Sequence, residues 1–169
     1  MSARHIVVMG VSGCGKSAVG ERLAAALGLG LIEGDSFHSQ GNIGKMKQGV
    51  ALTDGDRQGW LAELGGELSR HLAGAVLTCS ALKRSYRDEL RAAAPGLRFV
   101  HLALGQQDAL GRVAGREGHF YPPSLVASQF DALEDPAGEP GVIAVDAMLP
   151  LPVVVQRVLQ AMGREFNNP

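Results

Sequence analysis

The sequence predicts a doubly wound α/β fold, in which a parallel sheet of five strands is covered by helices on both faces. Apolar runs of strand length alternate along the chain with segments whose apolar residues recur at helical spacing. The runs at 6–9, 75–79 and 142–145 are apolar at nearly every position, which is typical of strands buried on both faces. Strands connected in this way are parallel, so their carboxyl ends meet at one edge of the sheet, where ligands bind.

Length and charge narrow the class of protein. The 169 residues predict a single domain over 1–169. The net charge of −1 gives no electrostatic argument for a nucleic acid or a membrane surface as partner. No apolar stretch approaches the about 20 residues of a membrane span. With only two cysteines and no secretory signal pattern, the sequence predicts a cytoplasmic protein.

The first strand leads into a glycine-rich loop, and a helical pattern follows at 18–27. The loop fits G-x-x-x-x-G-K-[S/T] and reads Gly10-Val11-Ser12-Gly13-Cys14-Gly15-Lys16-Ser17. Strand, loop and helix in this order predict a phosphate-binding loop, whose backbone N–H groups from Gly10 to Ser17 surround a polyphosphate such as that of ATP. Lys16 then reaches the β- and γ-phosphates, and Ser17 is the candidate ligand of Mg²⁺. A plain glycine-rich turn would need neither side chain.

A second, short strand is predicted at 31–33, and Asp35 follows it closely. The carboxyl end of that strand lies at the same edge of the sheet as the phosphate-binding loop, so Asp35 is expected to face the same cleft. A role as a helix or turn cap is the alternative.

The segment 36–56 is polar and interrupted by glycines, and we expect a long loop on the substrate side. Its anionic, cationic and amide groups suit hydroxyls and a carboxylate, although a solvated connection is the alternative. The next segment predicts a core-facing helix up to about residue 72, on the spacing of Trp60, Leu61, Leu64, Leu68 and Leu72.

From the carboxyl end of the third strand, 75–79, the segment 80–84 is expected to run into a helix that reaches about residue 93. Four polar residues gather at that junction, and their spacing would let them grip an anion; they are Ser80, Lys83, Arg84 and Arg87. A solvated basic helix face is the alternative. The fourth strand is predicted at 97–102.

The segment 106–133 predicts helices on either side of a glycine and two prolines, which resembles a mobile lid. Arg112 and Arg116 are four residues apart, so both guanidinium groups can face a nucleotide phosphate. Exposed arginines without partners are the alternative. The fifth strand follows at 142–145, ending at Asp146, and Pro150 opens a last helix.

A phosphate-binding loop serves GTPase switches, ATPase motors and small-molecule kinases. A GTPase would recognise guanine through Asn-Lys-x-Asp, but none of the four lysines follows an asparagine. Motors usually have longer chains, and the candidate acid Asp146 lies beyond the lid, where it suits a motor poorly. A small-molecule kinase is favoured, with a non-catalytic nucleotide-binding module as the alternative.

Several further blocks of residues are more specific than the phosphate-binding loop. They are Gly34-Asp35, Phe37-His38, Asn42-Ile43 with Lys45-Met46, Asp54 with Asp56-Arg57, Trp60-Leu61, Cys79-Ser80-Ala81-Leu82-Lys83-Arg84, Arg116 with Gly118-His119-Phe120, and Ser128-Gln129-Phe130. Over nearly the whole chain they resemble the gluconokinases of the thermoresistant type. The resemblance implies the three-layer P-loop kinase fold with a mobile helical lid, a frequent homodimer, and transfer of phosphate from ATP to D-gluconate to give 6-phosphogluconate. A kinase for another small hydroxy acid, similar to shikimate kinase, is the nearest alternative.

The resemblance also implies roles for individual residues. Asp35 would orient or deprotonate the 6-hydroxyl of gluconate. The charge on the transferred phosphoryl group would be balanced by Lys16, Arg112 and Arg116, and the candidates for the carboxylate and hydroxyls of the sugar acid are His38, Arg57, Lys83, Arg87 and His119. This chain departs from the family where Ser39 replaces a proline, where Gly59 replaces another, and where Glu139-Pro140-Gly141 lacks an arginine.

Overall fold

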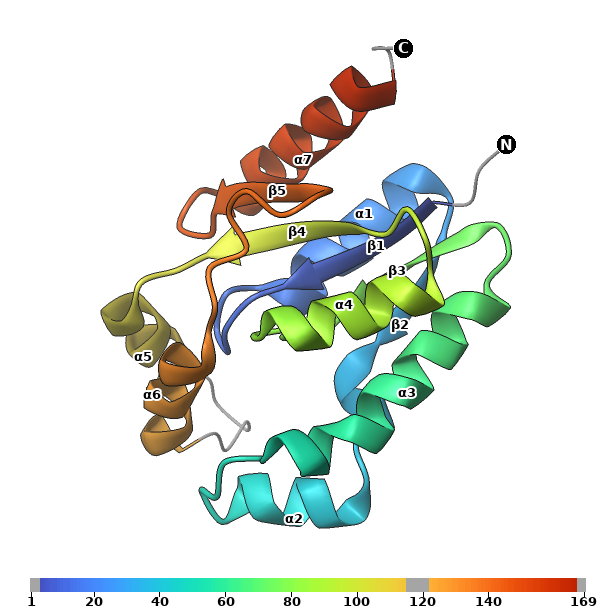
Figure 1. Ribbon diagram of the computed structural model, residues 1–169. Coiled ribbons are helices and arrows are strands. Elements are labelled where there is room, and N and C mark those ends of the chain that lie inside the picture. The colour runs from blue at the N-terminus through green and yellow to red at the C-terminus, as the bar shows by residue number, and fades with distance from the viewer. Residues whose placement is uncertain (1–3, 115–121, 167–169) are drawn as a thin grey trace.

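A five-stranded parallel sheet forms the middle layer of the structure, a computed structural model that describes residues 4–114 and 122–166 (Figure 1). The strand order is β2-β3-β1-β4-β5. The strands are β1 (Arg4–Met9), β2 (Gly30–Glu33), β3 (Gly74–Thr78), β4 (Arg98–Ala103) and β5 (Val142–Asp146). Every neighbouring pair is parallel. The predicted fold class is therefore confirmed, with β1 at the centre of the sheet.

Helices cover both faces of the sheet. Figure 1 shows α1 (Lys16–Leu27) and α7 (Leu151–Phe166) on one face, and α3 (Asp54–Arg70) and α4 (Arg84–Ala93) on the other. Three shorter helices lie beyond the carboxyl ends of the strands; they are α2 (Gln40–Lys47), α5 (Gln106–Ala114) and α6 (Pro123–Ala132). The helices predicted on either side of the glycine and prolines of 106–133 are thus present as α5 and α6.

The central strand β1 explains why the sheet sequences are so apolar. Its side chains alternate between the two faces: Ile6 and Val8 pack in the cluster under α1 and α7, while Val7 and Met9 pack in the cluster under α3 and α4. All four side chains are fully buried. A strand in this position must be apolar at every residue, and the burial of both faces holds the carboxyl end of β1 rigidly in place.

The prediction of a long loop at 36–56 is wrong, because this segment contains helical structure. A 3₁₀ turn, η1 (Gly34–Phe37), is followed by α2, and α3 already begins at Asp54. The hydroxyl of Ser39 caps α2 by accepting the N–H of Asn42 at 3.1 Å. At α3, Thr53 and Asp56 form a reciprocal capping box. Helix α2 buries only Asn42, so it has no apolar stripe that a periodicity could reveal.

The helix predicted to follow the third strand is present as α4, which begins at Arg84 and ends at Ala93. Residues 80–83 form an irregular turn in which Ala81 has φ 46°, a left-handed conformation. The four polar residues of this segment consequently do not share one helix face. At the surface, the Nε atom of Arg84 lies 3.8 Å from the Oδ2 atom of Asp88, whereas the side chain of Arg87 is fully buried. The anion-gripping cluster is not formed.

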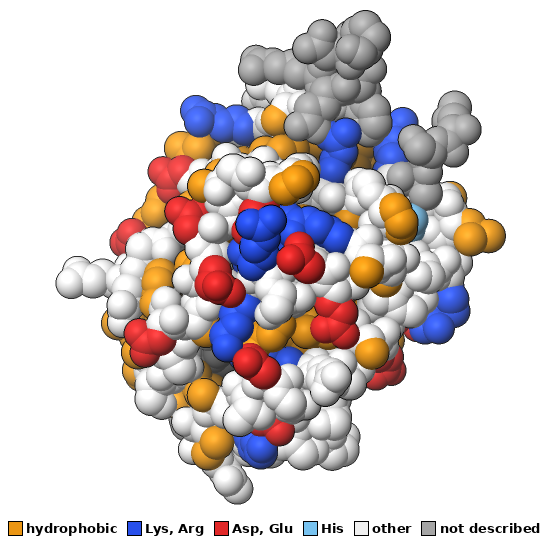
Figure 2. Space-filling model, in the orientation of Figure 1, with side chains coloured by type: hydrophobic (Ala, Val, Ile, Leu, Met, Phe, Trp, Pro, Cys, Tyr) orange, Lys and Arg blue, Asp and Glu red, His pale blue; other side chains and the backbone are white. Residues whose placement is uncertain are grey.

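Charged side chains of both signs alternate over the surface. On the face shown in Figure 2, Lys and Arg side chains lie next to Asp and Glu side chains over the region of α4. This mixture agrees with the net charge of −1. Within residues 4–114 and 122–166, no helix has both the length and the apolar character needed to cross a membrane.

Two leucines of the predicted core stripe of α3 test how burial sets stability. Leu68 is fully buried, but Leu72 lies beyond the end of α3 and is 85% exposed, so its predicted core position is wrong. We expect Leu68→Ala to lower the free energy of unfolding by about 2–5 kcal/mol because it leaves a cavity. Leu72→Ala should change it by less than about 0.5 kcal/mol. Urea unfolding of both variants checks this, and equal losses would contradict the assigned core.

Candidate active site

The glycine-rich loop turns tightly between β1 and α1. Gly10, Gly13 and Gly15 have φ values of 147°, 85° and 94°, which side chains rarely allow. At Gly10 a Cβ atom would lie 2.7 Å from the Sγ atom of Cys14, so only glycine fits. The loop therefore has the backbone conformation that a phosphate-binding loop needs, with the N-terminus of α1 directed at it.

The ammonium group of Lys16 lies over this loop. Its Nζ atom donates to the carbonyl oxygens of Gly10 at 3.0 Å and Val11 at 3.1 Å. These bonds fold the side chain back along the loop. The positive charge and the backbone amides of the loop are thus concentrated at one place.

A cavity of about 280 Å³ opens beside the loop and collects side chains from five parts of the chain. Among the residues that line it are Ser12, Lys16, Asp35, His38, Arg57 and Ser80. A second cavity of about 300 Å³ is lined by Asp54, Lys83 and Tyr86 and shares Leu52, Arg57 and Gln129 with the first. The structure thus brings five predicted residues, Lys16, Asp35, His38, Arg57 and Lys83, to two adjoining cavities.

Asp35 points into solvent at the mouth of the first cavity. Its side chain is 90% exposed, and it sits inside η1, whose N-cap position belongs to Glu33. The ring of His38 lies close to its carboxylate, with 3.9 Å between Oδ1 of Asp35 and Nε2 of His38. Among the hydrogen bonds of the described residues, none caps a helix through this carboxylate. The alternative of a structural cap is not supported.

His38 forms part of the wall next to Asp35. Its ring is stacked on the ring of Trp60 with 4.1 Å between the centroids, and its Nδ1 atom lies 3.4 Å from the side-chain amide nitrogen (Nδ2) of Asn42. Burial lowers the pKa of His38, although the carboxylate of Asp35 acts in the opposite direction. The ring is therefore neutral at pH 7 and can accept or donate a hydrogen bond.

Glu33 is a site residue that the sequence analysis missed. Its Oε2 atom accepts the hydroxyl of Ser17 at 3.1 Å and the buried hydroxyl of Thr78 at 2.5 Å. It is the last residue of β2, so the reasoning that selected Asp35, a carboxylate at the end of a strand, applies to it as well. Ser17 and Glu33 together offer oxygen atoms to a hard cation.

Gln129 is a second residue that was not singled out for a role. Its Oε1 atom accepts the backbone N–H of Ser12 at 2.6 Å, which joins α6 to the phosphate-binding loop. It lines both cavities. Only its place in the block Ser128-Gln129-Phe130 drew attention to it, because nothing in periodicity or charge marks a glutamine on a helix.

Arg112 lies against the phosphate-binding loop but donates to the backbone. Its two terminal nitrogens bond to the carbonyl oxygens of Gly13 at 3.0 Å and Ala147 at 2.8 Å. This arrangement braces the loop against the segment after β5 and differs from the predicted contact with a phosphate. Arg116 and His119, the other predicted lid residues, lie outside the described residues.

The structure does not bring Arg87 to either cavity, which corrects the prediction that it contacts a substrate. Its side chain is fully buried, and its guanidinium group bonds to Glu139 and to backbone carbonyls. Lys83 does line the second cavity, where its ammonium group pairs with Asp54 at 2.9 Å. Tyr86 and Lys83 both donate to this carboxylate and lower the pKa of Asp54.

Comparisons with known proteins agree on one family. Residues 6–140 match the family model described as an AAA domain. The gluconokinase of Gluconobacter oxydans is 43% identical over 98% of this chain and 94% of its own length. The thermoresistant gluconokinase of Escherichia coli is 39% identical over 95% and 94%, and the thermosensitive one is 38% identical over 96% and 89%.

Solved structures give the same result. A gluconokinase from Sinorhizobium meliloti superposes with a TM-score of 0.89 at 49% identity, covering 95% of this chain and 92% of that one. A sugar kinase from Janibacter in its unliganded form superposes with a TM-score of 0.90 at 40% identity, covering 95% of each chain. With a P-loop kinase fold, a cavity beside the phosphate-binding loop and relatives that match over more than 90% of their own length, the chain belongs to the gluconokinase family.

Proposed function

We propose that this protein transfers the γ-phosphoryl group of ATP to the 6-hydroxyl of D-gluconate, giving 6-phosphogluconate and ADP. The observation that carries the proposal is the cavity in which Lys16 and the phosphate-binding loop face Asp35, next to side chains that suit hydroxyls and a carboxylate. The curated gluconokinases that it resembles over nearly their full length support the same reaction.

The residues divide the work between positioning and charge balance. Asp35 orients the 6-hydroxyl and accepts its proton as the oxygen bonds to the γ-phosphorus, while the bond to the leaving ADP breaks. Lys16 balances the charge on the phosphoryl oxygens, and we keep this role for Arg116 on the resemblance alone. Catalysis of this kind consists mainly of alignment and electrostatic stabilisation.

The sugar acid is proposed to extend from Asp35 into the second cavity. Arg57 lines both cavities and is the proposed partner of the carboxylate. His38 and Lys83 offer hydrogen bonds to hydroxyls, and His119 stays a candidate from the resemblance. The adenine end of ATP has a separate place, a small cavity of about 160 Å³ lined by Cys14, Val19, Arg112, Leu149 and Val154 among others.

Mg²⁺ fits the oxygen atoms at the start of α1. The hydroxyl of Ser17 and the carboxylate of Glu33 are the residues that would hold it, the carboxylate directly or through water. When bound, the ion supplies charge neutralisation for the phosphates. The described residues contain no cluster of three His, Cys, Asp or Glu side chains, which suits Mg²⁺ better than a metal that needs a full protein cage.

Two other functions have less support. A kinase for a shikimate-like acid would use the same phosphate-binding loop, and a non-catalytic module would need only that loop. A non-catalytic module would leave the side chains of the second cavity without a purpose, and the relatives named above disfavour both functions. A cytoplasmic location and a homodimer complete the proposal; the first rests on the need for ATP and the second on the family resemblance.

A substrate panel with ATP and Mg²⁺ tests the proposed reaction. We expect kcat/KM for D-gluconate to exceed that for shikimate, glycerate or a nucleoside monophosphate by at least about 100-fold, because a pocket built for hydroxyls rejects ligands that leave those groups unpaired. Coupled detection of ADP measures each rate. A better rate with another acid would reassign the substrate, and no turnover with any of them would favour the non-catalytic module.

Lys16→Ala should abolish turnover while leaving the fold intact. Among the residues that the structure describes, Lys16 bonds only to atoms of its own loop, so its loss removes charge at the phosphates and little packing. We expect a fall in kcat of at least about 10³-fold with a melting temperature within a few degrees of the wild type. Near-normal ADP release by the folded variant would contradict the proposed catalytic role.

Asp35→Asn keeps the size of the side chain and removes its charge. If Asp35 orients and deprotonates the hydroxyl, kcat should fall by about 10²–10⁴-fold with ATP affinity changed by only a few-fold. Asn caps a helix as well as Asp does, so a structural cap would leave turnover nearly unchanged. Measuring kcat, ATP affinity and melting temperature on this variant separates the two roles.

Glu33→Gln tests the proposed metal site. The change removes a negative charge beside Ser17, so we expect half-maximal activity to need about 10-fold more Mg²⁺. Glu63→Gln, on the exposed side of α3, is the matched control and should not alter the Mg²⁺ dependence. An unchanged Mg²⁺ requirement in Glu33→Gln would exclude Glu33 from the metal site.

A further inference from the structure

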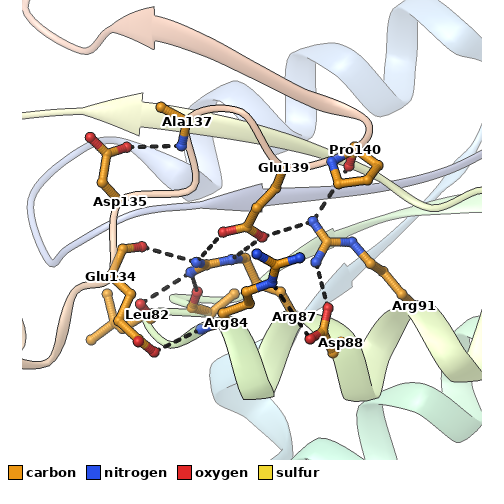
Figure 3. A network of polar contacts seen from close by, with 11 residues as sticks. Leu82, Arg84, Arg87, Asp88, Arg91, Glu134, Asp135, Ala137, Glu139 and Pro140 are labelled. Atoms are coloured by element: carbon orange, nitrogen blue, oxygen red, sulfur yellow. Dashed lines mark hydrogen bonds and ion pairs between the residues drawn. The ribbon is translucent and has the colours of Figure 1, made fainter.

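Arg87 is a fully buried arginine whose role the proposed reaction does not explain. An unpaired charge in this position would be strongly destabilising, so its donors must be satisfied within the protein. Figure 3 shows that they are. Nη1 donates to the carbonyl oxygens of Ala81 at 2.8 Å and Leu82 at 3.1 Å, and Nη2 donates to the carbonyl oxygen of Glu134 at 2.9 Å.

The carboxylate of Glu139 fixes the plane of this guanidinium group. Nε and Nη2 of Arg87 reach its two oxygens at 3.0 Å and 2.6 Å, a bidentate pair. Glu139 is itself 6% exposed, and its bonds to Arg87 and Arg91 lower its pKa, so it stays charged. Because the guanidinium group is planar and held in one orientation, its remaining N–H groups point in fixed directions.

Two of those bonds hold the irregular turn 80–83 after β3. Ala81 adopts its left-handed conformation there, which is unfavourable for a residue with a side chain and needs support from its surroundings. The turn presents Ser80 to the first cavity and Lys83 to the second. The carbonyl oxygen of Ser80 also accepts the N–H of Gly10 at 3.3 Å, so the turn touches the phosphate-binding loop.

The third bond holds the chain just beyond α6. Glu134 follows α6 by two residues, and its own N–H donates to the carbonyl oxygen of Leu82 at 2.8 Å. Its carboxylate accepts the N–H of Arg84 at 3.0 Å. Helix α6 carries Gln129, which lines both cavities. One guanidinium group is therefore bonded both to the turn that carries Ser80 and Lys83 and to the chain just beyond α6 (Figure 3).

We infer that Arg87, aligned by Glu139, is a positioning residue that sets the separation between the turn 80–83 and α6, and thereby the fit of the acceptor in the second cavity. The inference rests on the proposed gluconate kinase activity for its kinetic consequence. Arg87 lines neither cavity, so we place its effect on acceptor binding and not on the chemical step. Misplacement of a binding group by about 1 Å can cost as much as 10²-fold.

A pair of variants separates positioning from stability. Arg87→Met removes the bonds to the turn and leaves Glu139 to Arg91, so we expect a lower melting temperature and a KM for gluconate raised by about 10–100-fold, with the KM for ATP changed by less than about 3-fold. Arg87→Met/Glu139→Leu replaces the pair by apolar side chains and should recover stability. The KM for gluconate should stay raised in the double variant.

Arg91→Met is the matched control. Arg91 bonds to the same Glu139 at 3.0 Å from one turn further along α4, and its bonds reach neither the turn 80–83 nor Glu134. We expect it to lower stability without changing the KM for gluconate. An equal rise in KM for Arg91→Met, or a normal KM in folded Arg87→Met or in the double variant, would overturn the inference. If Arg87→Met does not fold, the double variant decides.

A readout without turnover keeps this test independent of the substrate. The amide of Glu134 is bonded to Leu82 only while the turn and the end of α6 stay together. Its hydrogen exchange should accelerate at least about 10-fold in the double variant and stay unchanged in Arg91→Met. Unchanged exchange in the double variant would overturn the inference, whereas inactivity of the wild type towards gluconate would overturn only the proposed function.

Discussion

The parallel pairing of β1 with β3 on one side and β4 on the other is the constraint on which the site depends. It places the carboxyl end of β1 between two neighbours that are buried on both faces. The phosphate-binding loop leaves that end, and the N–H of Gly10 is bonded across to Ser80 at the end of β3. A slip of one residue would turn every β1 side chain to the other face, so packing fixes the register and with it the loop.

The same constraint explains which parts of the molecule could be predicted. Apolar runs such as 75–79 identified the sheet because a strand covered on both faces can carry little else. Helix α2 could not be found in this way because it buries only Asn42, and its start depends on the cap formed by Ser39. Helix propensity is weak information when no packed face accompanies it.

The candidate site was predictable where one local motif fixes both residue and position, as for Lys16 and Asp35. It was not predictable where the partner is remote in sequence. Glu139 lies 52 residues from Arg87, and Gln129 lies 117 residues from Ser12. From sequence, Arg87 was one more cation beside Lys83. In the structure Lys83 is the N-cap of α4 and lines the second cavity, whereas Arg87 lies inside the helix and is fully buried.

The single tryptophan of the chain has a position with a practical consequence. Trp60 is stacked on His38, and its indole N–H donates to the carbonyl oxygen of Gly34 at 2.8 Å, one residue before Asp35. The tryptophan fluorescence of the protein therefore comes from one position, directly behind the His38 ring that lines the first cavity. Any ligand that shifts the imidazole or η1 alters the environment of this one fluorophore, so the unmodified chain carries its own optical reporter of acceptor binding.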